Sequence, residues 1–452
     1  MTAANARKLF GTDGIRAVAG EYPLDAATIY AAGLALGHSL RKTAAEPKVI
    51  LGRDTRESGP WIAATLAAGL IETGVRVESA GVVPTPAVAF LARTHGFQAG
   101  VVISASHNPW QDNGIKLFGA DGYKLADAVE LAMEEEILHH AANSAAPDPS
   151  TLPAVEDNAA FQTDYIQFLL DCVPGLSLDG VRIVADCANG AAAAVAPRLF
   201  RRLGGEVTLL NVAPDGHNIN LNCGALHPKQ VAAEVAARGA DLGLTFDGDA
   251  DRCMLAGSHN NVINGDAILL IAARDLKERG LLTGDLVVAT TMSNMGLEAA
   301  LRRSGIAMLR AQVGDRYVLE LMREHGCTIG GEPSGHIILS DYNTTGDGFV
   351  AALQVLAVVR KLQQPVSVVC HRFDPLPQVT KNVRYRNGKP HEDATVRSAI
   401  TSATERLNGH GRVIVRPSGT EPVIRITGEG DDPNLVEDVV DGIVEAVTQV
   451  AG

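Results

Sequence analysis

The chain has 452 residues, of which 46% are hydrophobic and 20% charged, and its formal net charge is −13. At about 100–200 residues per domain, this length predicts three or four domains, and the composition argues against a disordered chain. The negative charge disfavours nucleic acid and anionic membranes as main partners, and no run of about 18 apolar residues predicts a membrane-spanning helix.

The first regular segment of the chain alternates strands and helices. An apolar strand is predicted at 49–51, an alanine-rich helix at 62–73 and a second strand at 75–77. A further strand at 100–103 runs directly into the polar sequence SASHNP at 104–109. The alternation predicts a sheet with parallel strands covered by helices.

This pattern recurs twice, which indicates an internal repeat. The second copy has strands at 182–184, 207–210 and 242–246, and the third has strands at 286–288 and 327–330 and a helix at 296–303. Polar sequences again follow the last strand of each copy: DGDADR at 247–252 and GEPSGH at 331–336. Ligands of such sheets bind beyond the carboxyl ends of the strands, so these three segments are the candidate site.

The C-terminal part differs from the repeats. Strands at 411–415 and 423–426 flank the sequence RPSGTEP at 416–422, and a helix is predicted at about 434–450. The expected fold is therefore three similar α/β domains with largely parallel sheets, plus a smaller C-terminal α+β domain. The predicted domains are residues 1–156, 157–256, 257–369 and 370–452, and the Ala/Ser/Pro-rich stretch 141–153 is predicted to be a linker.

Asp247, Asp249 and Asp251 form the strongest single constellation. Three carboxylates at the end of a buried strand repel one another, and a divalent cation removes that penalty. A calcium loop is excluded because Arg252 and Ser258 stand where glycine and glutamate are needed. The sequence therefore predicts a magnesium site whose shell is completed by substrate or phosphate oxygens, with a solvated acidic turn as the alternative.

Ser106 is the candidate nucleophile. It follows a buried strand and has His107 beside it, and no G-x-S-x-G elbow occurs that would indicate a hydrolase. A serine near a metal-binding carboxylate cluster suits phosphoryl transfer. A turn shaped by Asn108 and Pro109 is the alternative interpretation.

Other polar groups could bind anions or sugars. Arg16 and Lys116 could face an anion, although either could be an ordinary surface cation. The segment 416–420 together with Arg425 is typical of a phosphate receptor, and a hairpin turn is the alternative. The side chains of Glu332, Ser334 and His336 could bind sugar hydroxyls, although GEPSGH by itself is a Gly/Pro turn more often than a binding loop.

These motifs, in this order, resemble the α-D-phosphohexomutase family over nearly the whole chain. The shared sequences are GTDGIR at 11–16, SASHNP at 104–109, NGIK at 113–116, DGDADR at 247–252, GEPSGH at 331–336 and RPSGTEP at 416–422. Six motifs in register make a chance match very improbable. Two departures are Ala17, where glycine is usual, and Pro333, where many relatives carry glutamine.

The resemblance implies four domains around a central cleft, three of them similar α/β domains with mixed, largely parallel sheets. It also implies a role for each matching residue. Ser106 would carry a covalent phosphate, and Asp247, Asp249 and Asp251 would hold one Mg²⁺ together with the phosphoserine oxygens. Glu332 and Ser334 would bind the sugar, and the distal phosphate would be held by Arg416, Ser418, Gly419, Thr420 and Arg425. The groups placed near the reacting atoms would be Arg16, His107, Lys116, Arg252 and His336, with Lys116 the first and His336 the second candidate for the general base.

The resemblance also indicates a substrate class. FGTDGIR, VGDRYV at 313–318 and TTGDG at 344–348 look most like members that act on glucosamine phosphates and so feed UDP-N-acetylglucosamine synthesis. Asp315 could attract the ammonium of a hexosamine, or it could cap a helix that begins near Arg316. A glucose- or mannose-phosphate mutase is the alternative, and an inactive sugar-phosphate sensor is a remote one.

Location and partners follow from weaker signals. The start of the chain is polar and does not resemble a secretory signal, and the six cysteines form no C-x-x-C pair. Both observations favour a cytoplasmic enzyme. The expected partner is a small hexosamine phosphate, and a homodimer is possible.

Overall fold

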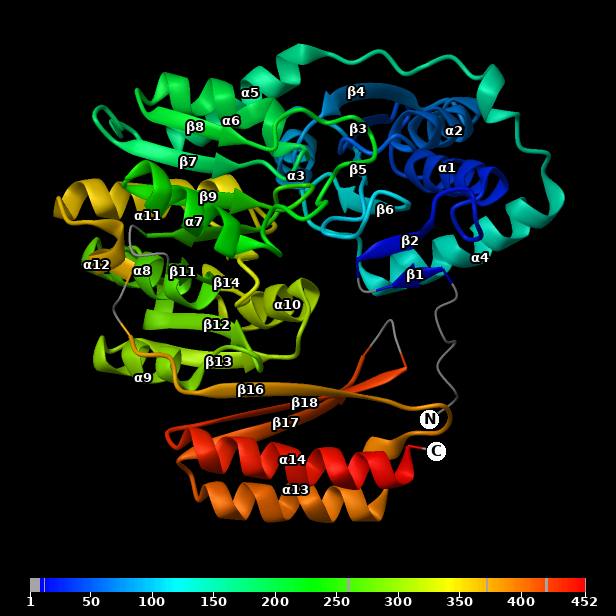
Figure 1. The fold of residues 1–452 in the computed structure, drawn as a ribbon. Helices are drawn as coiled ribbons and strands as arrows, with labels where there is room; N and C mark the ends of the chain where they lie inside the picture. The colour runs from blue at the N-terminus through cyan, green and yellow to red at the C-terminus, as the bar shows by residue number, and fades with distance from the viewer. Residues whose placement is uncertain (1–8, 12, 258–260, 371–372, 419–421, 452) are drawn as a thin grey trace. The chain divides into compact units, whose positions relative to one another are not determined.

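The computed structural model describes residues 9–11, 13–257, 261–370, 373–418 and 422–451 (Figure 1). The chain divides into two compact units: residues 1–290 with 309–371, and residues 291–308 with 372–452. Within the described residues, no helix is both long and apolar enough to cross a membrane.

The first sheet has the strand order β1-β2-β6-β5-β3-β4. Its strands are β1 (Phe10–Gly11), β2 (Gly14–Val18), β3 (Lys48–Arg53), β4 (Arg76–Val82), β5 (Ala99–Ile103) and β6 (Asp112–Gly119). Its helices are α1 (Ala26–Arg41), α2 (Gly59–Glu72), α3 (Thr85–Thr94) and α4 (Asp127–Asn143). The predicted linker at 141–153 is partly helical, because α4 extends to residue 143 and a short 3₁₀ turn covers Pro149–Thr151.

The second sheet has the order β11-β10-β9-β7-β8. Its strands are β7 (Arg182–Asp186), β8 (Glu206–Leu210), β9 (Leu242–Phe246), β10 (Cys253–Ala256) and β11 (Val262–Ile263). The helices of this part are α5 (Ala159–Asp171), α6 (Ala192–Arg202) and α7 (Pro228–Arg238).

The third sheet has the order β13-β12-β14-β15. Its strands are β12 (Leu286–Thr290), β13 (Ala307–Ala311), β14 (Ile329–Gly331) and β15 (Ile337–Leu339). The accompanying helices are α8 (Gly265–Glu278), α9 (Met295–Arg303), α10 (Asp315–His325), α11 (Gly348–Leu362) and α12 (Val366–Cys370).

The three sheets share one arrangement, which confirms the predicted repeat. The corresponding orders are β4-β3-β5-β6, β8-β7-β9-β10 and β13-β12-β14-β15. In each sheet the central strand runs parallel to the strand that carries the polar motif, and that strand pairs antiparallel with the next one. The three polar segments therefore lie between equivalent strands, and the sheets are mixed.

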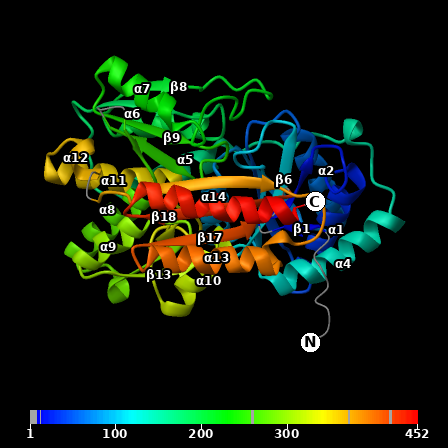
Figure 2. The same cartoon turned by 60° about the horizontal axis from the view of Figure 1, so that its bottom comes forward.

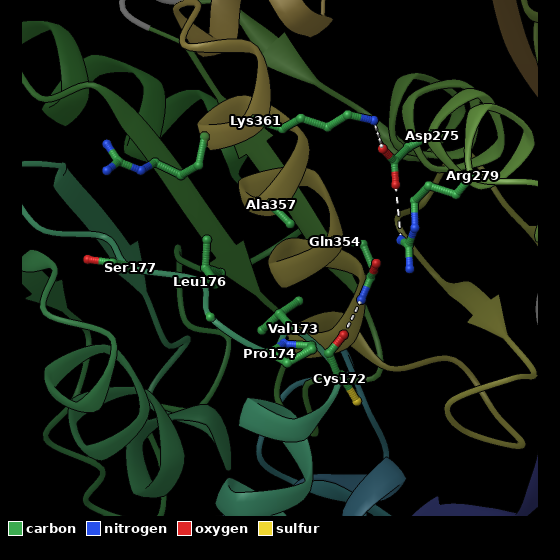
Figure 3. Close-up of a pocket in the computed structure, with 12 residues that line it drawn as sticks. Cys172, Val173, Pro174, Leu176, Ser177, Asp275, Arg279, Gln354, Ala357 and Lys361 are labelled. Carbon is green, nitrogen blue, oxygen red and sulfur yellow. Dashed lines mark hydrogen bonds and ion pairs between the residues drawn. The ribbon is translucent and has the colours of Figure 1, made fainter.

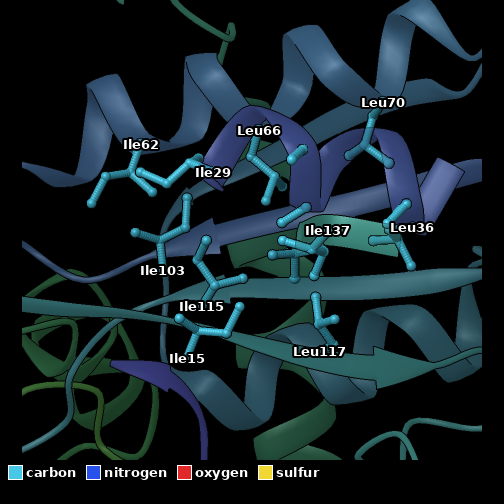
Figure 4. Close-up of a cluster of buried hydrophobic side chains, with 14 of the residues drawn as sticks. Ile15, Ile29, Leu36, Ile62, Leu66, Leu70, Ile103, Ile115, Leu117 and Ile137 are labelled. Carbon is cyan, nitrogen blue, oxygen red and sulfur yellow. The ribbon is translucent and has the colours of Figure 1, made fainter. Parts of the chain in front are cut away.

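Apolar side chains from α1, α2, α4 and the first sheet form one buried cluster (Figure 4). Ile29, Leu66 and Ile137 are each at most 1% exposed. The helices α1 and α2 approach closely at Gly33, where an added Cβ would lie 2.3 Å from the carbonyl oxygen of Leu66. This core fixes the helices on which the first sheet and its polar loop depend.

The C-terminal unit contains the antiparallel sheet β16-β18-β17. Its elements are β16 (Gln378–Arg384), α13 (Ala394–Leu407), β17 (Gly411–Pro417), β18 (Val423–Gly430) and α14 (Pro433–Val450). Figures 1 and 2 show α13 and α14 covering one face of this sheet, where valine and isoleucine side chains form a second core. The predicted α+β domain and its final helix are thus confirmed.

Candidate active site

Ser106 lies in the loop between β5 and β6, buried and with a left-handed backbone (φ 53°). Its hydroxyl donates to Asp247 Oδ2 at 2.6 Å, and its N–H donates to Ser104 Oγ at 2.9 Å. His107 Nδ1 lies 3.3 Å from the same hydroxyl. A positive φ on a non-glycine residue costs about 1–3 kcal/mol and persists only where the surroundings fix it, which is typical of functional sites.

Asp54 and Arg56 fix this loop, and the sequence analysis missed both. They form a fully buried ion pair at 2.5 Å, and Asp54 Oδ2 also accepts a hydrogen bond from Ser104 Oγ at 2.6 Å. Arg56 donates to the carbonyl oxygens of Asn108 and Asp112, each at 2.6 Å. The signal was present: Asp54 and Arg56 directly follow the apolar strand of the first repeat, as the polar motifs follow theirs.

Asn220 is a third support that sequence reasoning missed. Its Nδ2 donates to the carbonyl oxygen of Ser106 at 2.9 Å and to that of Asn108 at 3.1 Å. The residue belongs to the loop that follows β8, so only the folded chain brings it to Ser106.

The three aspartates converge as expected between β9 and β10. Asp247, Asp249 and Asp251 are buried, and one carboxylate oxygen of each lies within 4.8 Å of the others. Burial, together with repulsion from Asp251 and Asp249, raises the pKa of Asp247 well above its usual range. Asp249 Oδ1 is buried and has no hydrogen-bond partner among the described residues, as expected for an oxygen placed to bind a cation.

Lys116 enters this cluster from β6. Its Nζ lies 2.8 Å from Asp249 Oδ2, 3.1 Å from Asp13 Oδ2 and 3.6 Å from Asp251 Oδ2. Burial alone would lower the pKa of Lys116, but Asp13, Asp249 and Asp251 outweigh it and raise that pKa. The side chain is therefore a fully buried cation held among carboxylates, not a surface lysine.

Arg16 and Thr85 join the same group. Arg16 forms an ion pair with Asp13, and its Nη1 lies 3.4 Å from the carbonyl oxygen of Ala105. The Thr85 hydroxyl, another group that sequence reasoning missed, donates to Asp249 Oδ2 at 2.5 Å.

Arg252 and His336 complete the ring of polar groups. Arg252 Nε lies 3.9 Å from Asp247 Oδ2 and 3.8 Å from Asp251 Oδ1. His336 Nδ1 lies 3.6 Å from Asp251 Oδ1. Burial opposes the charged imidazole, but the carboxylates of Asp251 and Asp315 raise the pKa of His336 to about 9. In contrast, burial and the charge of Arg252 lower the pKa of His107 to about 4.

Glu332 and Ser334 lie together in the loop between β14 and β15. Glu332 Oε1 accepts the N–H of Gly314 at 3.0 Å, and Ser334 donates to Glu332 Oε2 at 3.2 Å. Pro333 lacks an N–H, but its carbonyl oxygen accepts the N–H of Gly265 at 3.1 Å, which ties the loop to the start of α8.

Asp315 opens α10 and does not cap it, because the N-cap position is Gly314. Its Oδ1 accepts the N–H of Arg316 at 2.8 Å, and its other oxygen forms an ion pair with Lys124. Lys124 also pairs with Asp13, and the sequence analysis did not single it out. The Asp315 carboxylate therefore already has a cationic neighbour.

The proposed phosphate receptor lies in the C-terminal unit and is considered by itself. Arg416 on β17 is paired directly with Arg425 on β18, so the two arginines share a face of that sheet. Arg425 Nε is buried and has no hydrogen-bond partner among the described residues. Ser418 follows β17, whereas Gly419 and Thr420 lie outside the described residues.

The described residues also line several pockets. A pocket of about 190 Å³ is lined by Lys124, Asp315, Arg316, Thr344 and neighbouring residues. A larger pocket of about 520 Å³, lined by Cys172–Ser177, Asp275, Arg279 and α11, shares no residue with the carboxylate cluster (Figure 3). We assign chemistry to the carboxylate cluster because the titratable groups converge there.

Comparison with protein families gives four matches along the chain. They are the phosphoglucomutase/phosphomannomutase α/β/α domains I (residues 7–144), II (163–260) and III (264–376) and the C-terminal domain of the same family (381–446). Together they cover most of the sequence in the order expected from the motifs.

Curated relatives match over nearly the full length. A phosphoglucosamine mutase of Azorhizobium caulinodans is 50% identical over 447 residues, which cover 99% of this chain and 100% of the relative. One from Koribacter versatilis is 49% identical, with 99% and 98% covered.

Solved structures share the fold. A phosphoglucomutase/phosphomannomutase family protein from Burkholderia thailandensis has a TM-score of 0.78 at 23% identity, with 98% of each chain covered. The N-acetylphosphoglucosamine mutase of Aspergillus fumigatus, solved with GlcNAc-6P and magnesium, has a TM-score of 0.62 at 17% identity, with 91% and 85% covered. Family models, relatives and fold agree: this chain belongs to the α-D-phosphohexomutase family and is similar throughout its length to the phosphoglucosamine mutases.

Proposed function

We propose that the chain is an isomerase that interconverts glucosamine 6-phosphate and glucosamine 1-phosphate by way of phosphorylated Ser106. The observation that carries the proposal is the hydrogen bond from the Ser106 hydroxyl to Asp247, inside a buried cluster with Asp249 and Asp251. Relatives named phosphoglucosamine mutase, with 50% and 49% sequence identity to this chain, support the choice of sugar. The product would feed UDP-N-acetylglucosamine synthesis.

Magnesium fits the carboxylate cluster. Asp247, Asp249 and Asp251 offer only hard oxygen ligands, and Asp249 Oδ1 is buried without a partner among the described residues. When bound, the ion would act as a Lewis acid on phosphoryl oxygens, including those carried by Ser106.

The reaction has two halves. First, the bond between phosphorus and Ser106 Oγ breaks as a free sugar hydroxyl bonds to phosphorus, and the hydroxyl proton passes to a base. The sugar bisphosphate then turns round. The bond between its other phosphorus and the sugar oxygen breaks as Ser106 Oγ bonds to that phosphorus, and the proton held by the base passes to the released sugar oxygen. Lys116 is the first candidate for the base and His336 the second. Because neighbouring carboxylates raise the pKa of both, each would have to release its proton before the sugar hydroxyl attacks.

Cations would hold the moving group. Arg16 and Arg252 lie near the carbonyl of Ala105 and near Asp247, so their guanidinium groups are placed beside the Ser106 loop. Two-pronged contacts of arginine with phosphoryl oxygens would neutralise charge that develops during transfer. Because the pKa of His107 is lowered, its imidazole would be neutral and would hydrogen-bond to Ser106 without forming an ion pair with the phosphate.

Sugar and distal phosphate would be bound elsewhere. Glu332, Ser334 and Asp315 would hold sugar hydroxyls and the amine. Arg416, Ser418 and Arg425, with Gly419 and Thr420, would hold the phosphate that is not reacting. The buried, unpartnered Nε of Arg425 supports an anion there.

A glucose- or mannose-phosphate mutase is the second candidate. Lys124 already pairs with the Asp315 carboxylate, which weakens the attraction of that carboxylate for a substrate ammonium. The deciding experiment compares kcat/KM for the phosphates of glucosamine, glucose and mannose on one preparation, together with the intact mass of Ser106 peptides. A preference for glucose or mannose phosphate would overturn the sugar assignment; absence of phosphate on Ser106 throughout turnover would overturn the mechanism.

The remaining predictions concern setting and organisation. We propose that the enzyme acts in the cytoplasm, and the burial of its six cysteines supports this. The boundaries near residues 156, 256 and 369 and a homodimeric state stay predictions.

A further inference from the structure

A second group of metal-ligating side chains lies on the outside of the first α/β domain, where α1 packs against α4. His38 lies in the last turn of α1, and Glu136 and His140 lie one turn apart on α4. Glu136 Oε1 is 2.6 Å from His38 Nδ1 and 3.7 Å from His140 Nε2. None of the three residues takes part in the site described above.

The spacing of these atoms suits a tetrahedral cation. One ligand atom of each residue lies within 4.8 Å of the other two. Ligands about 2.0–2.1 Å from a tetrahedral Zn²⁺ lie roughly 3.3 Å apart, and the two measured separations fall on either side of that value. Small side-chain rotations would therefore equalise them.

The backbone beneath the group is firmly held. Leu36, two residues before His38, and Ile137, next to Glu136, both belong to the buried cluster of Figure 4 and are at most 2% exposed. The two helices that carry the ligands are thus packed on the same core, which sets the ligand separation before any ion binds.

Access and tautomer also fit. The side chains of His38, Glu136 and His140 are 44%, 28% and 22% exposed, so an ion and a water ligand can reach them. Ser144 Oγ lies 3.4 Å from His140 Nδ1, which favours a proton on Nδ1 and leaves the Nε2 lone pair facing Glu136.

The ligand set decides the metal. Two imidazoles and one carboxylate suit Zn²⁺, whereas Mg²⁺ prefers oxygen ligands such as those of Asp247, Asp249 and Asp251. We propose that His38, Glu136 and His140 bind one Zn²⁺ per chain, with water as the fourth ligand, and so join the end of α1 to α4. The hydrogen bond between His38 and Glu136 is then the metal-free state of the site.

The test uses the full-length protein, stripped of metals and reloaded with excess Mg²⁺ to occupy the carboxylate cluster. Co²⁺, which replaces Zn²⁺ and absorbs visible light strongly in tetrahedral sites, is titrated first, and Zn²⁺ is then added to displace it. We expect one equivalent with a tetrahedral spectrum in the native protein. His38→Ala and His140→Ala should each weaken binding by at least about tenfold, the range seen when metal sites lose supporting groups.

His139→Ala is the matched control, because His139 is exposed on the same helix and outside the group. It should bind Co²⁺ and Zn²⁺ as the native protein does, and Zn²⁺ should raise the melting temperature of both but not of His38→Ala. A native protein without the tetrahedral spectrum, or equal binding by His38→Ala and His140→Ala, overturns the site. If either alanine variant fails to fold, Glu136→Gln takes its place. Mutase activity with Mg²⁺ should be unchanged in all variants, so this test does not depend on the proposed function.

Discussion

The loops after β5 and after β9 occupy equivalent places in two repeats, yet they are stabilised in different ways. Each contains a non-glycine residue with φ 53°, Ser106 in the first and Ala250 in the second. In the first loop the buried charges of Asp54 and Arg56 neutralise each other. In the second loop three carboxylates lie close together and are met by the cations Lys116, Arg252 and His336. Burial and repulsion still raise the pKa of Asp247, whereas the charges of Lys116 and His336 overcome burial and lower the pKa of Asp251.

The two loops therefore differ in whether a ligand is needed to stabilise them. The Ser106 loop is held by groups of the protein, so its shape does not require a ligand. The carboxylates of the aspartate loop repel one another, as the raised pKa of Asp247 indicates, so we expect a bound Mg²⁺ to stabilise this loop. The predictions below test this contrast.

The largest effect is expected from Ser106→Ala. Without the hydroxyl no phosphoserine forms, and turnover should fall by at least about three orders of magnitude, as when other nucleophiles are removed. Steady-state assays and intact-mass measurement check both parts. Full activity in the variant would show that another residue carries the phosphate.

Arg56→Met should mainly destabilise the fold. It leaves Asp54 buried without its partner, a change that costs about 3–5 kcal/mol of the free energy of unfolding. Arg53→Met is the control, because Arg53 pairs with a half-exposed Asp157 and a surface pair contributes about 0–1 kcal/mol. Urea unfolding measures both, and equal losses would contradict the bracing role of Arg56.

Asp249→Asn tests the second loop. Losing one of three carboxylates should weaken Mg²⁺ binding and cut kcat by roughly 10- to 100-fold, with recovery at high Mg²⁺. A chelator should abolish native activity until Mg²⁺ is restored. Asp241→Asn, at an exposed position, is the control. Normal turnover after chelation would remove the aspartates from the mechanism.

Arg425→Ala extends the contrast to the C-terminal unit. If Arg425 holds a phosphate that does not react, its contribution is the same in ground and transition states, so KM should rise and kcat should change little. A lost charge-assisted hydrogen bond of about 1.5–3 kcal/mol corresponds to roughly a 10- to 150-fold rise. A large fall in kcat at constant KM would argue against this role.

Asp315→Asn should have the smallest effect. Because Lys124 shares the carboxylate, we expect the preference for glucosamine over glucose phosphate to fall by about tenfold, the lower end of a charge-assisted hydrogen bond. The measurement is the ratio of kcat/KM for the two sugars in native and variant enzyme. An unchanged ratio would place sugar selection elsewhere, for example at Glu332.

Most of the candidate site could be predicted because its residues stand at the ends of strands. Strand β9 was expected at 242–246 and is observed there, and the aspartates follow it directly. Ser106 and Glu332 follow the corresponding strands of the other repeats. Local patterns of apolar and polar residues carry this information.

The supporting residues could not be found in the same way. Asn220 reaches Ser106 across 114 residues, and Lys124 reaches Asp315 across 191. Neither side chain has a distinctive local pattern, and their roles arise only when separate repeats meet. Asp315 shows the same limit, because its helix was expected but its pairing with Lys124 was not.

The antiparallel return strand in each repeat has a mechanical consequence. Each polar loop is the tip of a β-hairpin, because the strand before it pairs antiparallel with the strand after it. These pairs are β5 with β6, β9 with β10 and β14 with β15. A hairpin tip cannot swing open without breaking the ladder beneath it. The room that a bisphosphate needs to turn round should therefore come from displacement of whole sheets and not from flapping loops. Backbone amides of β5 and β9 should accordingly stay protected from hydrogen exchange throughout turnover.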